Sequence, residues 1–416
     1  MIRAFVLATA LALASAGAAT AQDAGRSNLE SAEAAYDRGD YAEAVRWYRM
    51  AADQGLADAQ FVLGFMYANG RGVPQNEAEA VRWYRMAADQ GLADARFVLG
   101  FMYSNGRGVP QNYAEAVRWY RMAADQGNAI AQSNLGVMYA NGRGVPQNEA
   151  EAVRWYRMAA DQGDEIAQVN LGDTYSNGRG VPQNDAEAVR WYRMAADQGN
   201  ALAQLYVGQR YANGQGVSRN DAEAARWYRM AADQGNAQAQ FNLGVMYDVG
   251  RGVPQNYADA MRWYRMAADQ GFASAQFKLG GMYEDGRGVP QNFTEAMRWY
   301  RMAADQGNAT AQNIIGSMYG NRFRDVQVVP QNYAEAVRWY RMAADQGNSQ
   351  GQLSLGHSYL HGEGVPTNYV EAYKWFALSA AQGNVFAGTP RDFVLEKMTP
   401  AQIAEGQRLV AAWRPS

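Results

Sequence analysis

The side chains that could do chemistry are few in this sequence. It has no cysteine and only two histidines, His357 and His361. The missing thiols exclude a disulfide framework, a thiolate metal site and a cysteine nucleophile. Histidines four residues apart on a helix can bind a metal, but no third ligand stands nearby. His361 also takes a place that other segments fill with a helix-ending asparagine, such as Asn69 and Asn105. We therefore predict no metal site and no cofactor.

Motifs of catalytic classes are also missing or weak. The sequence lacks Ser-x-x-Lys, His-Glu-x-x-His and a phosphate loop ending in Gly-Lys-Ser/Thr. Its Gly-Arg-Gly-Val segments, such as Gly70–Val73, have no lysine after them, and their residue types are typical of turns. Arg38-Gly39-Asp40 matches an adhesion tripeptide but falls in a tight interhelical turn. The carboxylates recur with arginines nearby, as in Glu79 and Arg82, which is the pattern of solvated ion pairs. We predict no enzyme.

Composition limits the partners. The formal net charge of the 416 residues is −3 and 48% of them are hydrophobic. A nucleic-acid-binding protein should carry a basic excess, so we predict no nucleic-acid partner. The chain is long enough for two or three ordinary domains or for one long repeat array.

The N-terminal residues have the pattern of a secretory signal peptide. Arg3 precedes the apolar run Ala4–Gly17, and Ala19-Thr20-Ala21 is a cleavage site of the A-x-A type. We predict cleavage after Ala21, no membrane span after cleavage, and a periplasmic or secreted protein. The alternative is a retained membrane anchor, for which the run is short.

The elements that must position any site come from one repeated unit. The motif Arg-Trp-Tyr-Arg-Met-Ala-Ala-Asp-Gln-Gly recurs, and its tryptophan returns every 36 residues from Trp47 to Trp299. The next tryptophan, Trp339, comes 40 residues later because Asn321–Val329 is longer than its counterparts, and Trp375 follows after 36. A period of this length is typical of solenoids.

The sequence of each unit predicts two helices, and the unit Leu56–Gly91 serves as the example. Ala59, Leu63 and Tyr67 have helical spacing, and Asn69-Gly70 supplies a left-handed helix end. Pro74 prevents continuation, and Asn76 is a candidate N-cap for a second helix over about Ala78–Asp89. The apolar face of that helix is Ala80, Trp83, Tyr84, Ala87 and Ala88. One hairpin cannot bury its own tryptophan, so we expect neighbouring hairpins to bury it.

Residues 56–383 resemble the Sel1-like repeat family, which is related to the tetratricopeptide repeat. The matching pattern is Ala-x-x-x-Leu-Gly-x-x-Tyr, Gly-x-Gly-Val and Ala-x-x-Trp-Tyr-x-x-Ala-Ala-x-x-Gly. Nine units follow it, with departures such as Val207, Ile315 and Phe376. The resemblance implies an all-α fold, an α-solenoid with a right-handed superhelix of helix-turn-helix repeats. We predict a signal peptide over 1–21, a linker and tetratricopeptide-like hairpin over 22–55, nine repeats over 56–383, and capping helices over 384–416. Thr399–Gln402 is a capping box for the last helix.

Comparison of the repeats with one another identifies a variable stripe on the first helix. Counting from Leu56, the third, seventh and tenth residues vary, and their spacing of three and four puts them on one helix face. By the resemblance, first helices line the concave surface. We call these positions the first-helix stripe; our candidate partner-binding residues on it are Phe65, Phe101, Val62, Val98, Asn134, Asn170, Tyr206, Asn242 and Lys278.

The best interpretation is an exported, non-enzymatic scaffold that binds a protein or peptide along this groove, in envelope signalling or assembly. Neutral variation at exposed positions is the competing explanation of the stripe. Two other functions stay open: a penicillin-binding or penicillin-hydrolysing enzyme, because some cysteine-rich members of the family are described so, and a structural protein associated with peptidoglycan in the cell wall. The long loop near Phe323 is a further candidate contact.

Overall fold

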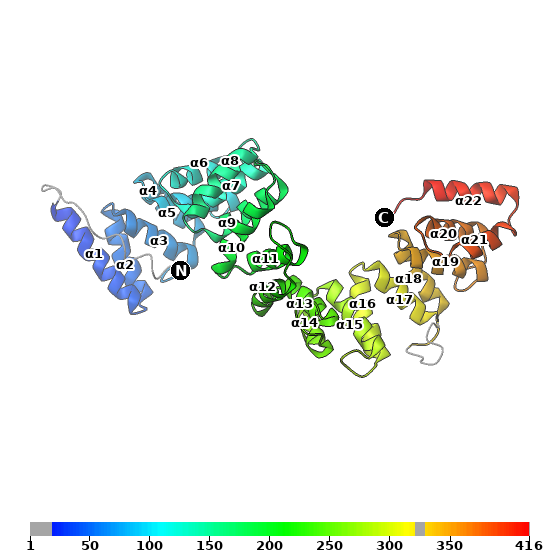
Figure 1. The fold of residues 1–416 in the computed structure, drawn as a ribbon. Helices are drawn as coiled ribbons and strands as arrows, with labels where there is room; N and C mark the ends of the chain where they lie inside the picture. Colours follow the sequence, from blue (N-terminus) through cyan, green and yellow to red (C-terminus); the bar gives the residue numbers. More distant parts are fainter. Residues whose placement is uncertain (1–18, 321–328, 416) are drawn as a thin grey trace. The chain divides into compact units, whose positions relative to one another are not determined.

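The computed structural model describes residues 19–320 and 329–415. Over these ranges the chain forms helices and no strands, and it divides into two compact units, Met1–Gln198 and Gly199–Ser416 (Figure 1). The signal-peptide residues 1–18 and most of the long loop, including Phe323, lie outside the described residues. The helices of the first unit are α1 (Ala19–Asp37), α2 (Tyr41–Asp53), α3 (Ala57–Asn69), α4 (Glu77–Asp89), α5 (Ala93–Asn105), α6 (Tyr113–Ala124), α7 (Ala129–Asn141), α8 (Glu149–Asp161), α9 (Glu165–Asn177) and α10 (Asp185–Asp197).

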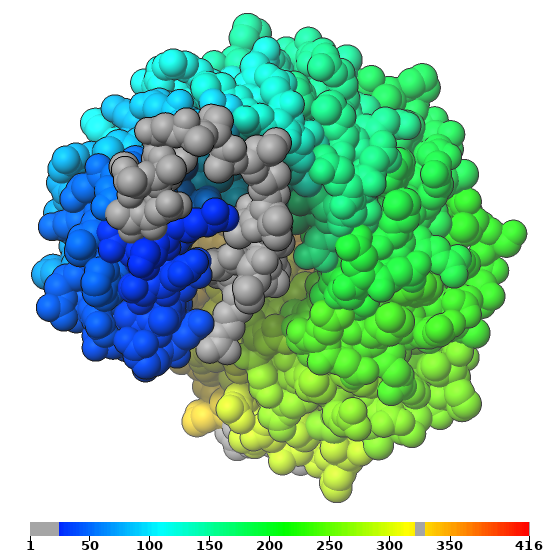
Figure 2. All heavy atoms as spheres, turned by 90° about the vertical axis from the view of Figure 1, so that its left-hand side faces the viewer, coloured from blue at the N-terminus to red at the C-terminus, as the bar shows by residue number. Residues whose placement is uncertain are grey.

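The second unit continues the same pattern. Its helices are α11 (Ala201–Asn213), α12 (Asp221–Asp233), α13 (Ala237–Val249), α14 (Tyr257–Asp269), α15 (Ala273–Asp285), α16 (Phe293–Asp305), α17 (Ala309–Tyr319), α18 (Tyr333–Asp345), α19 (Ser349–His361), α20 (Tyr369–Ala381), α21 (Gly388–Leu395) and α22 (Pro400–Ala412). Within each unit the repeat helices pack against their neighbours in the chain. The predicted all-α solenoid of helix hairpins is confirmed; α1 and α2 form its first hairpin, which Figure 2 shows in blue at the end of the first unit.

Helix boundaries follow the local signals of the sequence. In the repeat Leu56–Gly91, α3 ends at Gly70, which has a φ of 64° and the left-handed conformation expected of a C-cap. The Oδ1 atom of Asn76 accepts a hydrogen bond from the backbone N–H of Glu79 at 3.1 Å and so caps α4. Between the two helices, Gly72 has a φ of 71°, and a Cβ there would overlap the backbone of Tyr41 in α2. The loop therefore docks on the preceding hairpin at a point where only glycine fits.

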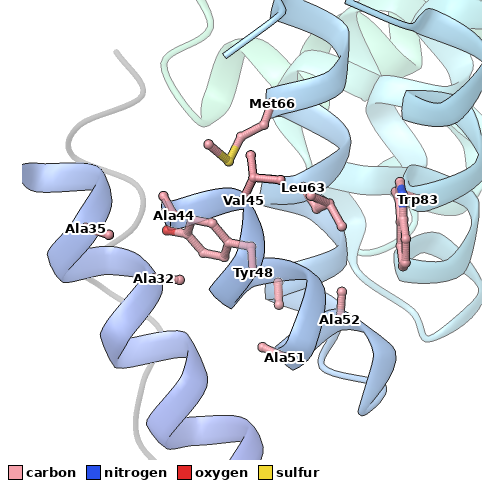
Figure 3. Packing of buried hydrophobic residues seen from close by; sticks show 11 residues of the cluster. Ala32, Ala35, Ala44, Val45, Tyr48, Ala51, Ala52, Leu63, Met66 and Trp83 are labelled. Carbon is pink, nitrogen blue, oxygen red and sulfur yellow. The ribbon is translucent and has the colours of Figure 1, made fainter. Parts of the chain in front are cut away.

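The core is a series of clusters, each shared by neighbouring hairpins. In the first cluster, Ala32 and Ala35 of α1 face α2, and the ring of Tyr48 in α2 points toward α1 (Figure 3). Leu63 of α3 and Trp83 of α4 complete the cluster on the other side of α2. Trp83 is only 4% exposed, although it belongs to the hairpin after that of Tyr48. The prediction that stacked neighbours bury each tryptophan is confirmed, so stability should depend on nearest-neighbour contacts.

Buried glutamines join the hairpins. Gln60 in α3 donates from Nε2 to the carbonyl oxygen of Ala52 in α2 at 3.0 Å, and its Oε1 accepts from Nε2 of Gln90 at 2.7 Å. The same pair of bonds recurs at Gln240, which donates to Ala232 and accepts from Gln270. Each pair satisfies the buried amide of the glutamine, and its bond to the alanine carbonyl links the hairpin to the one before it.

The last repeat is covered by two helices. Both α21 and α22 pack on α20. The predicted capping box is present: the Oγ1 atom of Thr399 accepts from the backbone N–H of Gln402 at 3.3 Å, and Oε1 of Gln402 accepts from the N–H of Thr399 at 2.8 Å. Trp413, which follows α22, packs beside Leu378 of α20.

Candidate interaction surface

The first-helix stripe is accessible at most of its positions. The seventh residue of every repeat is half-buried, from Val62 to Ser354, and the third residue is mostly exposed. This graded exposure follows from the helical spacing, because the alanine, leucine and glycine between these positions are turned into the core. The stripe is therefore partly exposed, although several of its apolar side chains, such as Val62 and Val98, also pack against core clusters.

The apolar end of the stripe lies in the first unit. Val62 and Val98 are half-buried, and the Phe101 ring is 41% exposed. Phe65 is more enclosed than its partner: it packs against the cluster formed by α4 and α5, and the guanidinium of Arg71 lies 5.3 Å from its ring centroid. Phe101 is therefore more exposed to solvent than Phe65, the other aromatic residue that the sequence predicted as a contact.

Carboxylates accompany this apolar end. Burial raises the pKa of Glu33, and the nearby charges of Asp37, Glu30 and Asp58 raise it further. Burial also raises the pKa of Asp94; a hydrogen bond from Nδ2 of Asn128 at 3.1 Å opposes this rise, and the charge of Asp58 adds to it. These like charges lie close enough to repel one another, so a cation brought near them would be stabilised.

Several amides of the stripe have partners inside the protein. Asn134 donates from Nδ2 to the carbonyl oxygen of Ile130 at 3.0 Å, and Asn242 accepts from Nε2 of Gln238 at 3.0 Å. Asn170 and Lys278 are half-buried, and Tyr206 packs against the core cluster of α11–α13. Asn134 and Asn242 thus already use part of their hydrogen-bonding capacity, which weakens the idea that they grip a peptide backbone.

Three aliphatic side chains of the stripe are more exposed than either phenylalanine. Ile130, Ile166 and Leu202, each at the third position, are 49%, 59% and 43% exposed. Our sequence comparison recorded the variability of this position without selecting these residues as contacts. The missed signal was their place in the first turn of a helix, where the preceding loop covers little of the side chain.

The histidines form no metal site in the described part of the chain. The rings of His357 and His361 stack with centroids 5.9 Å apart, and His357 also meets the edge of Phe376. Burial lowers the pKa of His357, and the neighbouring His361 lowers it further. Among the described residues, no group of three or more histidine, aspartate or glutamate side chains could hold a metal ion.

We expected no Gly-x-Ser-x-Gly motif, but the sequence contains one. Gly347–Gly351 reads Gly-Asn-Ser-Gln-Gly, the spacing of a hydrolase nucleophile elbow, which requires a strand followed by a helix. Here the segment joins α18 to α19; Asn348 is the N-cap of α19, and the backbone carbonyl of Ser349 accepts from Oγ of Ser379 at 2.7 Å. The motif therefore lies in an ordinary helix connection.

In the described ranges no helix is both long and apolar enough to cross a bilayer.

Comparisons with known proteins agree with the fold. A family model described as Sel1 repeat matches residues 34–56, 57–92, 93–128, 129–164, 166–200, 201–236, 237–272, 273–308, 309–348 and 349–384. The first match covers the second helix of the hairpin for which we predicted a tetratricopeptide-like character. No curated protein is similar to the chain at a significant level.

Two solved structures are similar over most of their length. One is c5321, a protective antigen present in uropathogenic Escherichia coli strains that displays an SLR fold; it is 35% identical, with 94% of this chain and 92% of that chain covered and a TM-score of 0.68. The other is a Sel1 repeat protein from Oxalobacter formigenes, which is 34% identical, with 78% and 91% covered and a TM-score of 0.60.

Proposed function

The chain belongs to the Sel1 repeat family, and we propose that it is an exported, non-enzymatic scaffold that binds a partner polypeptide along the first-helix stripe of its first unit. Sel1 repeats form a fold that is generally used for protein–protein interaction. The observation that carries the proposal is the accessible apolar row of Val62, Val98 and Phe101 beside carboxylates that repel one another.

The chemistry of this surface defines the partner. Half-buried valines and an exposed phenylalanine favour apolar side chains, because aromatic residues in partly desolvated positions contribute most to interfaces. Asp58 and Asp94 favour lysine or arginine on the same segment, because opposite charges speed association and select against acidic partners. We therefore expect a segment that combines basic and apolar residues.

Export rests on the N-terminal pattern and on one relative. Arg3, the apolar run and Ala19-Thr20-Ala21 favour secretion and cleavage after Ala21. The similar protein of uropathogenic Escherichia coli is described as a protective antigen, which agrees with export. A reporter fused to residues 1–30 should be exported; retention of that fusion in the cytoplasm would contradict this part of the proposal alone.

The binding proposal is tested with a library of short peptides that vary in charge and apolarity, presented to residues 22–416. Peptides rich in basic and apolar residues should bind. The F65A/F101A variant should bind them roughly tenfold or more weakly, in line with the loss of hot-spot aromatics. The matched control is F386A/F393A, which removes two phenylalanines that are 73% and 47% exposed on the C-terminal cap.

The outcomes separate the competing functions. If F65A/F101A and F386A/F393A bound the peptides equally well, the binding site would not lie on the first-helix stripe. Binding of acidic and basic peptides alike would contradict the charge argument. If no peptide bound, sedimentation with purified cell wall and hydrolysis of nitrocefin would test the structural and the penicillin-related alternatives.

A further inference from the structure

The second helices carry a regular row of exposed methionines. Each follows the arginine of the repeated motif, and eight of them are 36–48% exposed: Met50, Met86, Met158, Met194, Met230, Met266, Met302 and Met342. The equivalent Met122 is half-buried against a core cluster. We call these nine residues the methionine row.

A second set of methionines provides an internal comparison. Six methionines at the eleventh position of the repeat, counted from Leu56, are 0–5% exposed: Met66, Met102, Met138, Met246, Met282 and Met318. They lie in the core clusters beside leucine or isoleucine and tyrosine side chains. The chain thus holds the same side chain in two environments that differ mainly in access to solvent.

Access to the row follows from the geometry of the second helix. Around Met86, a shallow surface hollow is lined by Arg82, Arg85, Asp89 and Val109. Asp89 and Arg82 share the solvent face of α4 with Met86, because they are three and four residues away from it. A small solute can therefore reach the thioether sulfur without any rearrangement of the core.

Two facts set the reactivity of this row. The chain has no cysteine among its 416 residues and 19 methionines. Thiols are the other sulfur group that oxidants attack readily, so here the accessible thioethers are the side chains most open to two-electron oxidation. In the last repeat, where Trp413 covers the equivalent position, the residue is Leu378, which is 7% exposed. The position thus holds methionine in the repeats where it is accessible and leucine in the repeat where it is covered.

We propose that the methionine row is a set of modification sites that consume two-electron oxidants, of which hypochlorous acid is the one used as the probe here. The sulfur lone pair attacks chlorine and hydroxide leaves, which gives a chlorosulfonium ion. Water then adds to sulfur, and chloride and two protons leave, so that the product is methionine sulfoxide; one of the protons neutralises the hydroxide released in the first step. Sulfur loses two electrons, the chlorine of hypochlorous acid gains two, and the net products are the sulfoxide, chloride and one proton.

The fold tolerates this reaction at the row but not at the six buried methionines. A sulfoxide oxygen is polar and disrupts a core in which it is buried. At Met86 or Met230 that oxygen would point into water, whereas at Met246 it would lie in a cluster with Leu243 and Trp263. The row can therefore take up oxidant, and methionine sulfoxide reductases can restore it, while the stack stays folded.

The test exposes the folded chain to increasing amounts of hypochlorous acid and measures sulfoxide at each methionine by peptide mass spectrometry. Trypsin should release Met230–Arg251 as one peptide that contains both Met230 of the row and buried Met246. We expect sulfoxide at Met230 to form at least about tenfold faster than at Met246, with Met122 between them. Circular dichroism should show unchanged helicity until the row is consumed.

A matched variant tests the row as a whole. Replacing Met230, Met266, Met302 and Met342 by leucine conserves volume and should leave the melting curve unchanged, while the number of oxidising equivalents taken up before unfolding falls by about half, from eight exposed sites to four. The proposal is overturned if Met230 and Met246 react at the same rate, if oxidation of the row alone lowers helicity, or if the leucine variant takes up as many equivalents as the parent chain.

Discussion

Two adjacent glycines in α15 should respond in opposite ways to the same substitution. Gly280 is buried, and a Cβ built on it would lie 2.5 Å from Cδ1 and 2.6 Å from Cε1 of Tyr300. Gly281 is half-buried, and the nearest atom to its Cβ would be Oη of Tyr300 at 3.5 Å, an ordinary contact. Both residues lie inside the helix, so their backbone effects are alike.

The magnitudes can be worked out from these contacts. Replacing glycine by alanine inside a helix stabilises it by about 0.5–1 kcal/mol. At Gly280 the ring of Tyr300 must move by about 1 Å; this ring is 2% exposed, its Oη donates to Glu284 at 2.6 Å, and it packs against Phe277. Overpacking of this kind costs about 1–3 kcal/mol. We expect Gly280→Ala to destabilise α15 and α16 by roughly 1–2 kcal/mol and Gly281→Ala to stabilise them by about 0.5–1 kcal/mol.

Hydrogen exchange resolved by peptide is the suitable assay, because repeat arrays do not unfold in a single step. Amides of α15 and α16 should exchange roughly tenfold faster in Gly280→Ala, since 1.4 kcal/mol corresponds to a factor of ten. They should exchange several-fold more slowly in Gly281→Ala. If the amides of Gly280→Ala exchanged as slowly as those of the parent chain, the reasoning would be refuted, because the contact with Tyr300 would then not exclude a Cβ at residue 280.

Three further outcomes follow from the packing. Gln240→Ala should destabilise its hairpin by about 1–3 kcal/mol, because the carbonyl of Ala232 and the amide of Gln270 both lose a partner; exposed Gln350→Ala is the control for local exchange. Thr399→Ala should destabilise α22 by about 1 kcal/mol, seen as faster exchange there, whereas Thr389→Ala outside the capping box should not. Burial raises the pKa of Tyr120, Tyr156 and Tyr228 to about 12 from 10.0. The unfolded chain loses these protons first, so stability should fall as pH rises from 10 to 12, by roughly 3 kcal/mol per tyrosine; absorbance at alkaline pH that showed all tyrosines ionising near 10 while the helices persist would contradict this.

The helices were predictable because their signals are local. Asn76 and Gly70 act within one turn of the residues that they cap, so a single repeat contains the information for its own boundaries. The repetition also predicted the burial of Trp83, since a hairpin too small to cover this ring must be covered by its neighbour. The resemblance to the Sel1-like repeat family then predicted that the hairpins stack into an α-solenoid.

The details of the interaction surface were less predictable. Spacing placed Phe65 and Phe101 on one helix face, but only the packing of α4 and Arg71 makes Phe65 the more enclosed ring. Likewise, the sequence presents Asn134 and Asn242 as free amides, although both bond within their own helices. Exposure depends on the neighbouring chain segments, and spacing along one helix does not contain them.

The sequence by itself determined the period, the two helices of each repeat and the residues that face the core, because helix propensity, capping and amphipathic spacing act over a few residues. Tertiary structure alone decided which side chains join one hairpin to the next. Gln60 looks like an ordinary helix residue in the local sequence, yet its side chain donates to the carbonyl oxygen of Ala52 in the preceding hairpin. Tertiary structure also buried the six methionines of the first helices and left the methionine row accessible, because access to solvent is a property of the packed array.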